Sequence, residues 1–390
     1  MIEDQMTKQE SIEFMLPPRV IFGAGSLSKL GDIAREFGAH SLLVMGRSSL
    51  TQSGIKAQIE RFLSDSGVEV TEFEGVESNP SIETVDRGAE LARASNPDLV
   101  IGVGGGSVID AAKAISGLIT NGGSARDYLE EREITKPSLP CIAVPTTAGT
   151  GAEVTKNAVI TNHQEGYKRS IRSRHLIPAI ALVDPTLTLT MPPHLTAATG
   201  MDALTQLIEP YVCKNAWPIT DALAIYGIGL VGRSLRRAVR DGADLEARKD
   251  MALASLLSGM ALANSGLGAV HGLSHPLGAH WNIHHGVACA LLLPPVMGFN
   301  LGVAGEKYGD VARALGEDVE GLSSDEAALR ALQAVKRLAK DIGIPSGLAE
   351  MGIKEKDLPL IAEESHGSSM SKNPRTATDE ELVEILSKAM

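Results

Sequence analysis

The stretch Val100-Ile-Gly-Val-Gly-Gly-Gly-Ser-Val-Ile-Asp-Ala-Ala-Lys113 predicts an α/β fold with a ligand at the end of a strand. A short β-branched run leads into Gly104, Gly105 and Gly106, and a helical pattern follows. Glycines let backbone N–H groups approach a ligand closely, and a helix N-terminus adds a partial positive charge. Together they suit a pyrophosphate, although a tight strand-to-helix turn without a ligand has the same features. The pattern is not G-x-G-x-x-G, so the standard Rossmann fingerprint is absent.

Strand and helix patterns alternate around this stretch, which is typical of a parallel sheet with helices on both faces. An antiparallel hairpin is expected from Asn157–Ile160 and Lys168–Ile171, with its turn at 163–166. The expected strands of the sheet are Arg19–Phe22, Ser41–Met45, Val68–Phe73, Leu99–Val103, Cys141–Val144 and Ile180–Val183. The expected helices between them are Ser26–Phe37, Ile55–Ser66, Ile82–Ala94 and Val108–Ile119.

The character of the chain changes near Pro192-Pro193, after which long Ala/Leu-rich helical patterns replace the strands. We therefore predict an α/β domain over residues 1–190 and an all-helical domain over residues 191–390. Pro276 is expected to disturb the helix around it. The polar stretch Gly367–Thr378 is expected to be a surface loop. The expected helices are Thr220–Val239, Ala247–Asn264, Glu306–Leu315, Ser324–Asp341 and Asp379–Lys388.

The composition excludes several classes of protein. With 36 Lys and Arg against 48 Asp and Glu, the net charge is −12, which argues against a nucleic-acid partner or docking on anionic lipid. Aromatic residues are only 3% of the chain, which disfavours binders that stack single-stranded bases. The 40 glycines instead fit an enzyme with tight turns and a phosphate-bearing ligand.

The location of the protein is inferred from three negative features. The first ten residues, MIEDQMTKQE, do not have the pattern of a signal peptide. The apolar run Val287–Phe299 is interrupted by Pro294 and Pro295 and is shorter than the roughly 18 residues of a membrane span. The three cysteines are far apart, which predicts neither a disulfide framework nor a cysteine-based zinc site and favours a reducing compartment. A soluble cytoplasmic protein without a membrane partner is the expectation.

A second loop, Pro145-Thr-Thr-Ala-Gly-Thr-Gly151, again follows an expected strand. The hydroxyls of Thr146, Thr147 and Thr150 can bind a phosphate, a ribose or a nicotinamide amide, or they can simply cap the following turn. Because ligands of α/β sheets bind at the carboxyl ends of the strands, two such loops strengthen the prediction of a nucleotide site.

The helical half contains a set of metal-binding side-chain types. Asp202 and Gln206 are four residues apart and lie on one helix face, and His271 and His275 have the same spacing. A carboxylate with two imidazoles is a plausible set of ligands for Zn²⁺ or Fe²⁺. A histidine-rich helix-packing segment is the alternative.

With these motifs the sequence resembles the iron-containing, metal-dependent alcohol dehydrogenases (group III), a family that includes lactaldehyde reductase and propanediol dehydrogenase. The resemblance covers nearly the whole chain. It implies a dehydroquinate synthase-like architecture, with an N-terminal dinucleotide-binding domain and a C-terminal helical domain. The motifs that carry it are Phe22–Gly25, Asn79-Pro80, Gly104–Ser107 with Asp110 and Lys113, Pro145–Gly151, Ala198–Leu204, His271-Gly272, His275–Gly278 and His285-Gly286.

The resemblance implies metal ligation by Asp202, His271 and His285, while the remaining family histidine falls on Gln206. Three interpretations of this departure stay open. Gln206 ligates weakly through its oxygen, or the other three residues bind the metal with water, or the metal is lost as in maleylacetate reductases. The loss of a histidine nitrogen weakens the binding of Fe²⁺ more than that of Zn²⁺. Iron is therefore not favoured over zinc, and both ions remain candidates.

The resemblance also places residues around the cofactor and the substrate. His275 corresponds to a family histidine near the nicotinamide, where it contacts substrate or relays a proton, and packing is the alternative. Lys168 corresponds to a lysine near the nucleotide or is a solvated hairpin residue. We interpret His280 and His284 as structural. The implied cofactor-binding residues of the loops are Asn79, Gly104, Gly105, Gly106, Ser107, Asp110, Thr146, Thr147 and Thr150.

The choice between cofactors depends on the end of the second strand. NAD-using members of the family carry an acidic residue there, and that position falls on Gly46, followed by Arg47. Without a carboxylate a 2′-phosphate is not repelled, and Arg47 can bind it. We therefore predict NADP(H) over NAD(H), with a solvated Arg47 and bound NAD(H) as the alternative.

These features predict a metal-dependent, NAD(P)-linked alcohol dehydrogenase or aldehyde reductase of small substrates. A metal-independent reductase of the maleylacetate reductase type is the alternative. A carbon–oxygen lyase with the same architecture needs a cluster of Lys and Arg near the metal residues. The region 194–290 shows no such cluster around its metal residues. A non-catalytic protein would not need so many matched site residues. The resemblance also implies a homo-oligomer.

Overall fold

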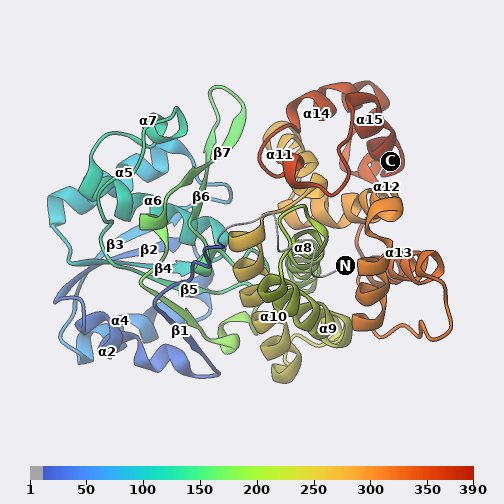
Figure 1. Ribbon diagram of the computed structural model, residues 1–390. Coiled ribbons are helices and arrows are strands. Elements are labelled where there is room, and N and C mark those ends of the chain that lie inside the picture. The colour runs from blue at the N-terminus through green and yellow to red at the C-terminus, as the bar shows by residue number, and fades with distance from the viewer. Residues whose placement is uncertain (1–11) are drawn as a thin grey trace.

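The computed structural model describes residues 12–390 and contains a parallel sheet with helices on both faces, followed by a helical bundle (Figure 1). The expectation that no signal peptide is present concerns residues 1–10, which lie outside the described residues.

The central sheet has six strands in the order β1-β8-β5-β4-β2-β3, and every neighbouring pair is parallel. This is the arrangement predicted from the alternation of strands and helices. The predicted hairpin is also present, as an antiparallel pair outside the sheet. The strands are β1 (Arg19–Phe22), β2 (His40–Gly46), β3 (Glu69–Val76), β4 (Leu99–Gly104), β5 (Cys141–Pro145), β6 (Asn157–Asn162), β7 (Tyr167–Arg172) and β8 (Ile180–Val183).

The inner strands of the sheet are apolar on both faces because helices cover both faces. Along β2, Leu42 and Val44 pack in one core cluster, and Leu43 and Met45 pack in another on the opposite face. A strand buried on both sides is therefore a continuous apolar run and not an alternating one. The helices of this half are α2 (Leu30–Arg35), α3 (Ser49–Gln52), α4 (Ile55–Asp65), α5 (Ile82–Ser95), α6 (Gly106–Asn121) and α7 (Ala125–Leu129).

The second half is built around α8, whose residues from Thr196 to Val212 are all buried. It packs against α9, α10 and α12, which places the side chains from Thr196 onward in the interior. The helices are α8 (Pro193–Val212), α9 (Pro218–Arg240), α10 (Leu245–Ser265), α11 (Ala269–Trp281), α12 (His285–Ala314), α13 (Ser324–Asp341), α14 (Leu358–Glu364) and α15 (Asp379–Ser387). Short 3₁₀ turns are η1 (Ser26–Lys29), η2 (Ala152–Val154), η3 (Arg174–Leu176), η4 (Pro185–Thr188), η5 (Leu348–Met351), η6 (Glu355–Asp357) and η7 (Met370–Lys372). The division of the chain into domains over residues 1–190 and 191–390 stays a prediction.

The expectation that Pro276 disturbs its helix was wrong, and Pro294 and Pro295, which interrupt the apolar run, do not end a helix either. Helix α11 continues through Pro276, and α12 continues through Pro294 and Pro295 to Ala314. The α12 helix breaks instead at Ala304, whose φ of −124° and ψ of 15° are not helical. Packing of α12 against α8, and of α11 against α12, outweighs the hydrogen bonds that the prolines remove.

Helix α12 is longer than the apolar run that the sequence suggested. By length and composition alone it is able to span a membrane, with a mean hydropathy of 1.8, but 61% of its most apolar window is buried inside the protein. Helices α10 and α11, bent by 105° at their junction, meet the same test as a pair. Buried core helices have this composition too, and the absence of a membrane partner stays a prediction.

The stretch Gly367–Thr378 is only partly a surface loop. Met370 and Asn373 are buried, and the Asn373 amide oxygen accepts a hydrogen bond from the Ala269 N–H at the start of α11. Its side chain also bonds to Asn300 of α12. A polar residue was mistaken for a solvated one because its partners lie far away in the sequence.

Candidate functional site

The two predicted loops meet at the carboxyl ends of β4 and β5, which are neighbours in the sheet. The Thr146 N–H donates to the Gly104 carbonyl over 2.9 Å. A Cβ on Gly106 would lie 2.6 Å from the Thr150 hydroxyl oxygen, so a side chain there would collide with the second loop. Gly105 faces Thr147, with 3.4 Å between a built Cβ and the Thr147 side chain. The loops therefore form one glycine-lined surface at the N-terminus of α6.

Three predicted cofactor residues form a connected group beside this surface. The Asn79 N–H donates to the Ser107 hydroxyl over 3.1 Å. The Asn79 side-chain oxygen accepts from Lys168 Nζ over 2.7 Å, which ties the β6–β7 hairpin to the end of β3. Burial lowers the pKa of Lys168. Lys168 is thus positioned by Asn79 and is not a freely solvated hairpin residue.

Asp110, also predicted to bind the cofactor, connects α6 to the hairpin. Its carboxylate accepts from the Val159 N–H of β6 and lies 2.9 Å from the ammonium of the fully buried Lys113. Lys113 also donates to the Ala152 carbonyl and to the Thr155 hydroxyl. The pair locks α6 to the hairpin and to η2.

The end of β2 approaches the same edge of the sheet. A Cβ on Gly46 would meet nothing closer than Val108, at 3.7 Å, so the position has room for a side chain. Arg47 is exposed, and within residues 12–390 it has no ion-pair partner. The geometry is compatible with a charge-selecting role at this position.

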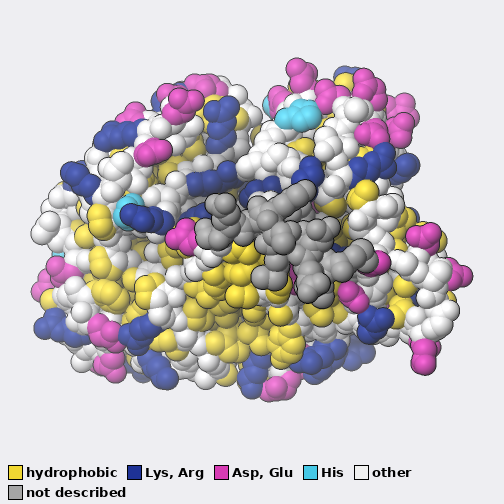
Figure 2. Space-filling model, in the orientation of Figure 1, with side chains coloured by type: hydrophobic (Ala, Val, Ile, Leu, Met, Phe, Trp, Pro, Cys, Tyr) yellow, Lys and Arg dark blue, Asp and Glu magenta, His cyan; other side chains and the backbone are white. Residues whose placement is uncertain are grey.

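A cleft of about 620 Å³ separates β7 from α11 and the segment after α14. Lys168 and His275 both line it. Figure 2 shows the hollow between the two halves, with Lys and Arg side chains beside it. Burial, and the positive charge of Lys168, push the pKa of His275 well below its usual value, so this imidazole is neutral near pH 7. His280 and His284 are exposed, and His280 lies 2.5 Å from Glu364.

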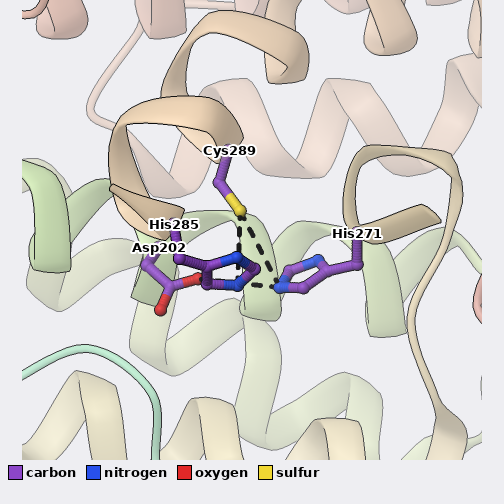
Figure 3. A group of neighbouring side chains, drawn as sticks. All are labelled: Asp202, His271, His285 and Cys289. Atoms are coloured by element: carbon purple, nitrogen blue, oxygen red, sulfur yellow. Dashed lines mark hydrogen bonds and ion pairs between the residues drawn. The ribbon is translucent and has the colours of Figure 1, made fainter. Parts of the chain in front are cut away.

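Four side chains from three helices converge beside the cleft (Figure 3). Asp202 Oδ1 on α8 is 3.6 Å from His271 Nε2 on α11 and 3.5 Å from His285 Nε2 on α12. Cys289 Sγ, one turn after His285, is 3.7 Å from His285 Nε2 and 4.0 Å from His271 Nε2. The four candidate donor atoms all lie within 4.8 Å of one another.

The orientation of His271 is set by Glu209, also on α8. Glu209 Oε2 lies 2.6 Å from His271 Nδ1, and Oε1 accepts from the Val270 N–H over 2.7 Å. A carboxylate on Nδ1 leaves the Nε2 lone pair free and makes it more basic, which is the usual support of a metal-binding histidine.

The charges in the cluster depend on one another. Burial acts to raise the pKa of Asp202, but the neighbouring His285 and His271 lower it to about 2. Burial acts to lower the pKa of His271, but Cys289 and Glu209 raise it well above its usual value. Burial lowers the pKa of His285 to about 3. The cluster therefore stabilises a proton on His271 but not on His285, and a bound cation would take the place of that proton.

The residues fit a divalent metal. Asp202 Oδ1 is buried and has no hydrogen-bond partner within residues 12–390, a costly state that a cation would relieve. The donors are a carboxylate oxygen, two imidazoles and a thiol, which are zinc ligands and suit other transition metals. Gln206 is also buried, and its oxygen accepts from the Ser258 hydroxyl over 3.3 Å.

Two residues of this site were missed in the sequence. Glu209 follows Asp202 by seven residues and Cys289 follows His285 by four, so each shares a helix face with a predicted ligand. That spacing was the signal in the sequence that could have indicated both residues. The cysteines were judged by their odd number, their distance in sequence and the lack of a C-x-x-C motif, and all three are free and buried.

Two family models match the chain: iron-containing alcohol dehydrogenase over residues 17–185, and the C-terminal part of the iron-containing alcohol dehydrogenase family over residues 196–390. The chain belongs to the iron-containing alcohol dehydrogenase family. It is 38% identical to the NAD-dependent methanol dehydrogenase of Bacillus methanolicus, over 97% of this chain and 99% of the relative. It is 42% identical to the lactaldehyde reductase of Escherichia coli K12, over 93% and 96%. A solved structure of 1,3-propanediol oxidoreductase superposes with a TM-score of 0.95 at 40% identity, covering 98% of this chain and all of that one.

Membership in the family confirms the predicted class of protein. The chain is an oxidoreductase that acts on CH–OH groups, and its fold is the dehydroquinate synthase-like fold of these enzymes. The iron-containing alcohol dehydrogenases bind a divalent metal and NAD(H). The family relationship does not assign roles to individual residues, which are inferred from the geometry of the site.

Proposed function

We propose that this chain interconverts small aldehydes and alcohols, using a nicotinamide cofactor on the β4 and β5 loops and a divalent metal held by Asp202, His271 and His285. The observation that carries the proposal is the buried, unpaired Asp202 Oδ1 facing two imidazole nitrogens at 3.5 and 3.6 Å. A bound metal would supply Lewis acidity, stabilising negative charge on the substrate oxygen while hydride moves between carbon and the nicotinamide.

The protein's own residues prepare the two partners for hydride transfer. Glu209 holds His271 with Nε2 toward Asp202, so the donors are aligned before a cation binds. The glycine-lined loops and the first turn of α6 bring backbone N–H groups toward a pyrophosphate. Lys168, held by Asn79, adds a positive charge at the edge of that surface.

We assign His275 to the substrate side of the cleft. It lies one helical turn beyond His271 and lines the cleft with Lys168. Because its imidazole is neutral, it can accept or donate a hydrogen bond to the substrate oxygen and pass a proton to solvent. It touches no metal donor atom in this assignment, so its loss would leave metal binding intact.

We also propose that the cofactor is NADP(H) rather than NAD(H). Support comes from the absence of a carboxylate at Gly46 and the unpaired Arg47 beside it. The methanol dehydrogenase relative is named NAD-dependent, so the two cofactors must be compared directly. A tenfold or larger preference for NADH in kcat/KM would contradict this proposal.

A panel of small aldehydes, assayed with NADH and NADPH, tests the function as a whole. The protein should be stripped of metal and reconstituted separately with Fe²⁺, with Zn²⁺ and with no metal. We expect activity only in the metal-loaded samples. Equal activity without metal would favour a metal-independent reductase of the maleylacetate reductase type.

A further inference from the structure

The fourth ligand position of the proposed metal site is where this chain departs from the family. The resemblance puts Gln206 there, but the structure places a different side chain against the other donors. Cys289 lies one turn after His285 on α12, is completely buried, and has its sulfur within 4.0 Å of both imidazole Nε2 atoms.

The distances fit a tetrahedral metal site. Bond lengths of about 2.0–2.1 Å to nitrogen and oxygen and about 2.3 Å to sulfur give donor–donor edges of about 3.3–3.6 Å in a tetrahedron. The edges between Asp202 and the two histidines are 3.5 and 3.6 Å, and those from Cys289 are 3.7 and 4.0 Å. These four of the six edges lie within about half an ångström of the tetrahedral values, and all six are within 4.8 Å, so a modest inward shift of the side chains would bring the four donors around one ion.

Gln206 is the weaker candidate for the fourth ligand. Its amide oxygen, the only atom of the side chain that would ligate a metal, accepts from the Ser258 hydroxyl over 3.3 Å. A neutral amide is also a weaker ligand than a thiolate for zinc. Gln206 therefore supports the site by hydrogen bonding, on the same face of α8 as Asp202.

The other cysteines do not share this environment. Cys213 Sγ donates to the carbonyl oxygens of Pro210 and Ser265, as a buried structural thiol does. Cys141 lies inside β5, in the apolar core on one face of the sheet. Only Cys289 among the three faces nitrogen donors, and this contrast supplies a matched control.

We propose that Cys289 is the fourth metal ligand, replacing Gln206, and that the resulting Asp-His₂-Cys set binds Zn²⁺ in preference to Fe²⁺. This inference rests on the proposed metal site. On binding, the thiol releases its proton to solvent and the thiolate sulfur donates to the metal, with no change of oxidation state. A soft thiolate favours zinc over iron, in addition to the general order of stability of divalent complexes.

Cobalt provides the direct test, because a Co²⁺–thiolate bond gives an intense near-ultraviolet charge-transfer band that nitrogen and oxygen ligands do not give. Metal-stripped wild-type protein and the variants Cys289→Ser, Cys141→Ser and Gln206→Ala are titrated with Co²⁺. We expect the band in wild type, Cys141→Ser and Gln206→Ala, and its loss in Cys289→Ser. We also expect Cys289→Ser to bind Zn²⁺ at least about tenfold more weakly, since a donor is lost.

The outcomes separate the two proposals. One bound Co²⁺ without the band in wild type, or the band retained in Cys289→Ser, overturns the role of Cys289 and leaves Asp202, His271 and His285 as ligands. No bound metal in wild type overturns both. Circular dichroism and the melting temperature of the stripped proteins check folding, and Cys289→Ala serves as a second variant. A higher affinity for Fe²⁺ than for Zn²⁺ contradicts the preference.

Discussion

Replacing Glu209 by Gln tests whether its carboxylate controls how His271 presents Nε2. In the native protein Glu209 Oε2 is 2.6 Å from His271 Nδ1, while Oε1 accepts from the Val270 N–H. A glutamine has the same shape and still offers one oxygen to Val270, so its NH₂ group faces Nδ1. Two donors cannot bond to each other, so Nδ1 must become the acceptor and the proton moves to Nε2. A protonated Nε2 has no lone pair for a metal.

The size of the effect follows from the burial of the pair. Loss of the partner of a metal-binding histidine costs about 10–100-fold in metal affinity. That range corresponds to about 1.4–2.7 kcal/mol of binding free energy. The His271 and Glu209 side chains are each only 4% exposed, so water cannot replace the lost partner, and we expect the upper part of the range.

The assay is a competition between the metal-stripped protein and a chelator for Zn²⁺. Glu364→Gln is the matched control, because Glu364 pairs with His280 over 2.5 Å but contacts none of the four donor residues. We expect wild-type affinity in the control and a loss approaching about 100-fold in Glu209→Gln. Equal Zn²⁺ affinity in wild type and Glu209→Gln, with both folded, would refute the reasoning.

Four further changes test other parts of the site and fold. Gly46→Asp should lower kcat/KM for NADPH by about tenfold, about 1.4 kcal/mol, and spare NADH, because a carboxylate there repels a 2′-phosphate; equal losses for both cofactors would contradict this. His275→Ala should lower kcat/KM for an aldehyde by about 100-fold with the metal content unchanged, and a loss of metal would point to a ligand instead. Asp110→Asn should lower the free energy of unfolding in urea by about 3 kcal/mol, because Lys113 is left buried without its carboxylate, and a change below about 0.5 kcal/mol would argue against the pair. Burial raises the pKa of Glu153 from 4.5 to about 7, so the folded state binds this proton more tightly and stability falls as the pH rises from about 4.5 to about 7. Glu153→Gln should then stabilise the protein by about 3 kcal/mol at pH 8 and hardly at pH 4, as urea unfolding at both values will show; an equal gain at both is the contrary result.

Local signals were enough for the sheet and most helices. The runs at Leu99 and Cys141 became strands because a sheet covered on both faces needs continuous apolar segments. The glycine and threonine loops were predicted to lie together because parallel strands end at the same edge, and the bond from Thr146 to Gly104 confirms that they do. Each of these strands and loops is marked by its own short stretch of sequence, and the parallel order of the strands brings the loops together.

The errors concern features that depend on distant neighbours. Nothing near Pro276 in the sequence indicates that packing against α12 keeps its helix continuous. Asn373 looked solvated because its partners, Asn300 and Ala269, are far away along the chain.

The site was predictable only in part, for the same reason. Asp202, His271 and His285 were predicted from motif resemblance, and they do come together. Cys289 and Glu209 acquire their roles through contacts between α8, α11 and α12, which spacing along one helix suggests but does not establish. A cytoplasmic location and a homo-oligomeric state stay predictions.

The most direct test of the central claim is the rate of aldehyde reduction before and after metal removal. The account predicts that a chelator lowers the rate by at least about 100-fold, since Lewis acidity contributes several kcal/mol, and that one equivalent of Zn²⁺ or Fe²⁺ restores it. Asp202→Ala should resemble the stripped enzyme and should not respond to added metal. A metal-stripped protein with the full rate would contradict the account.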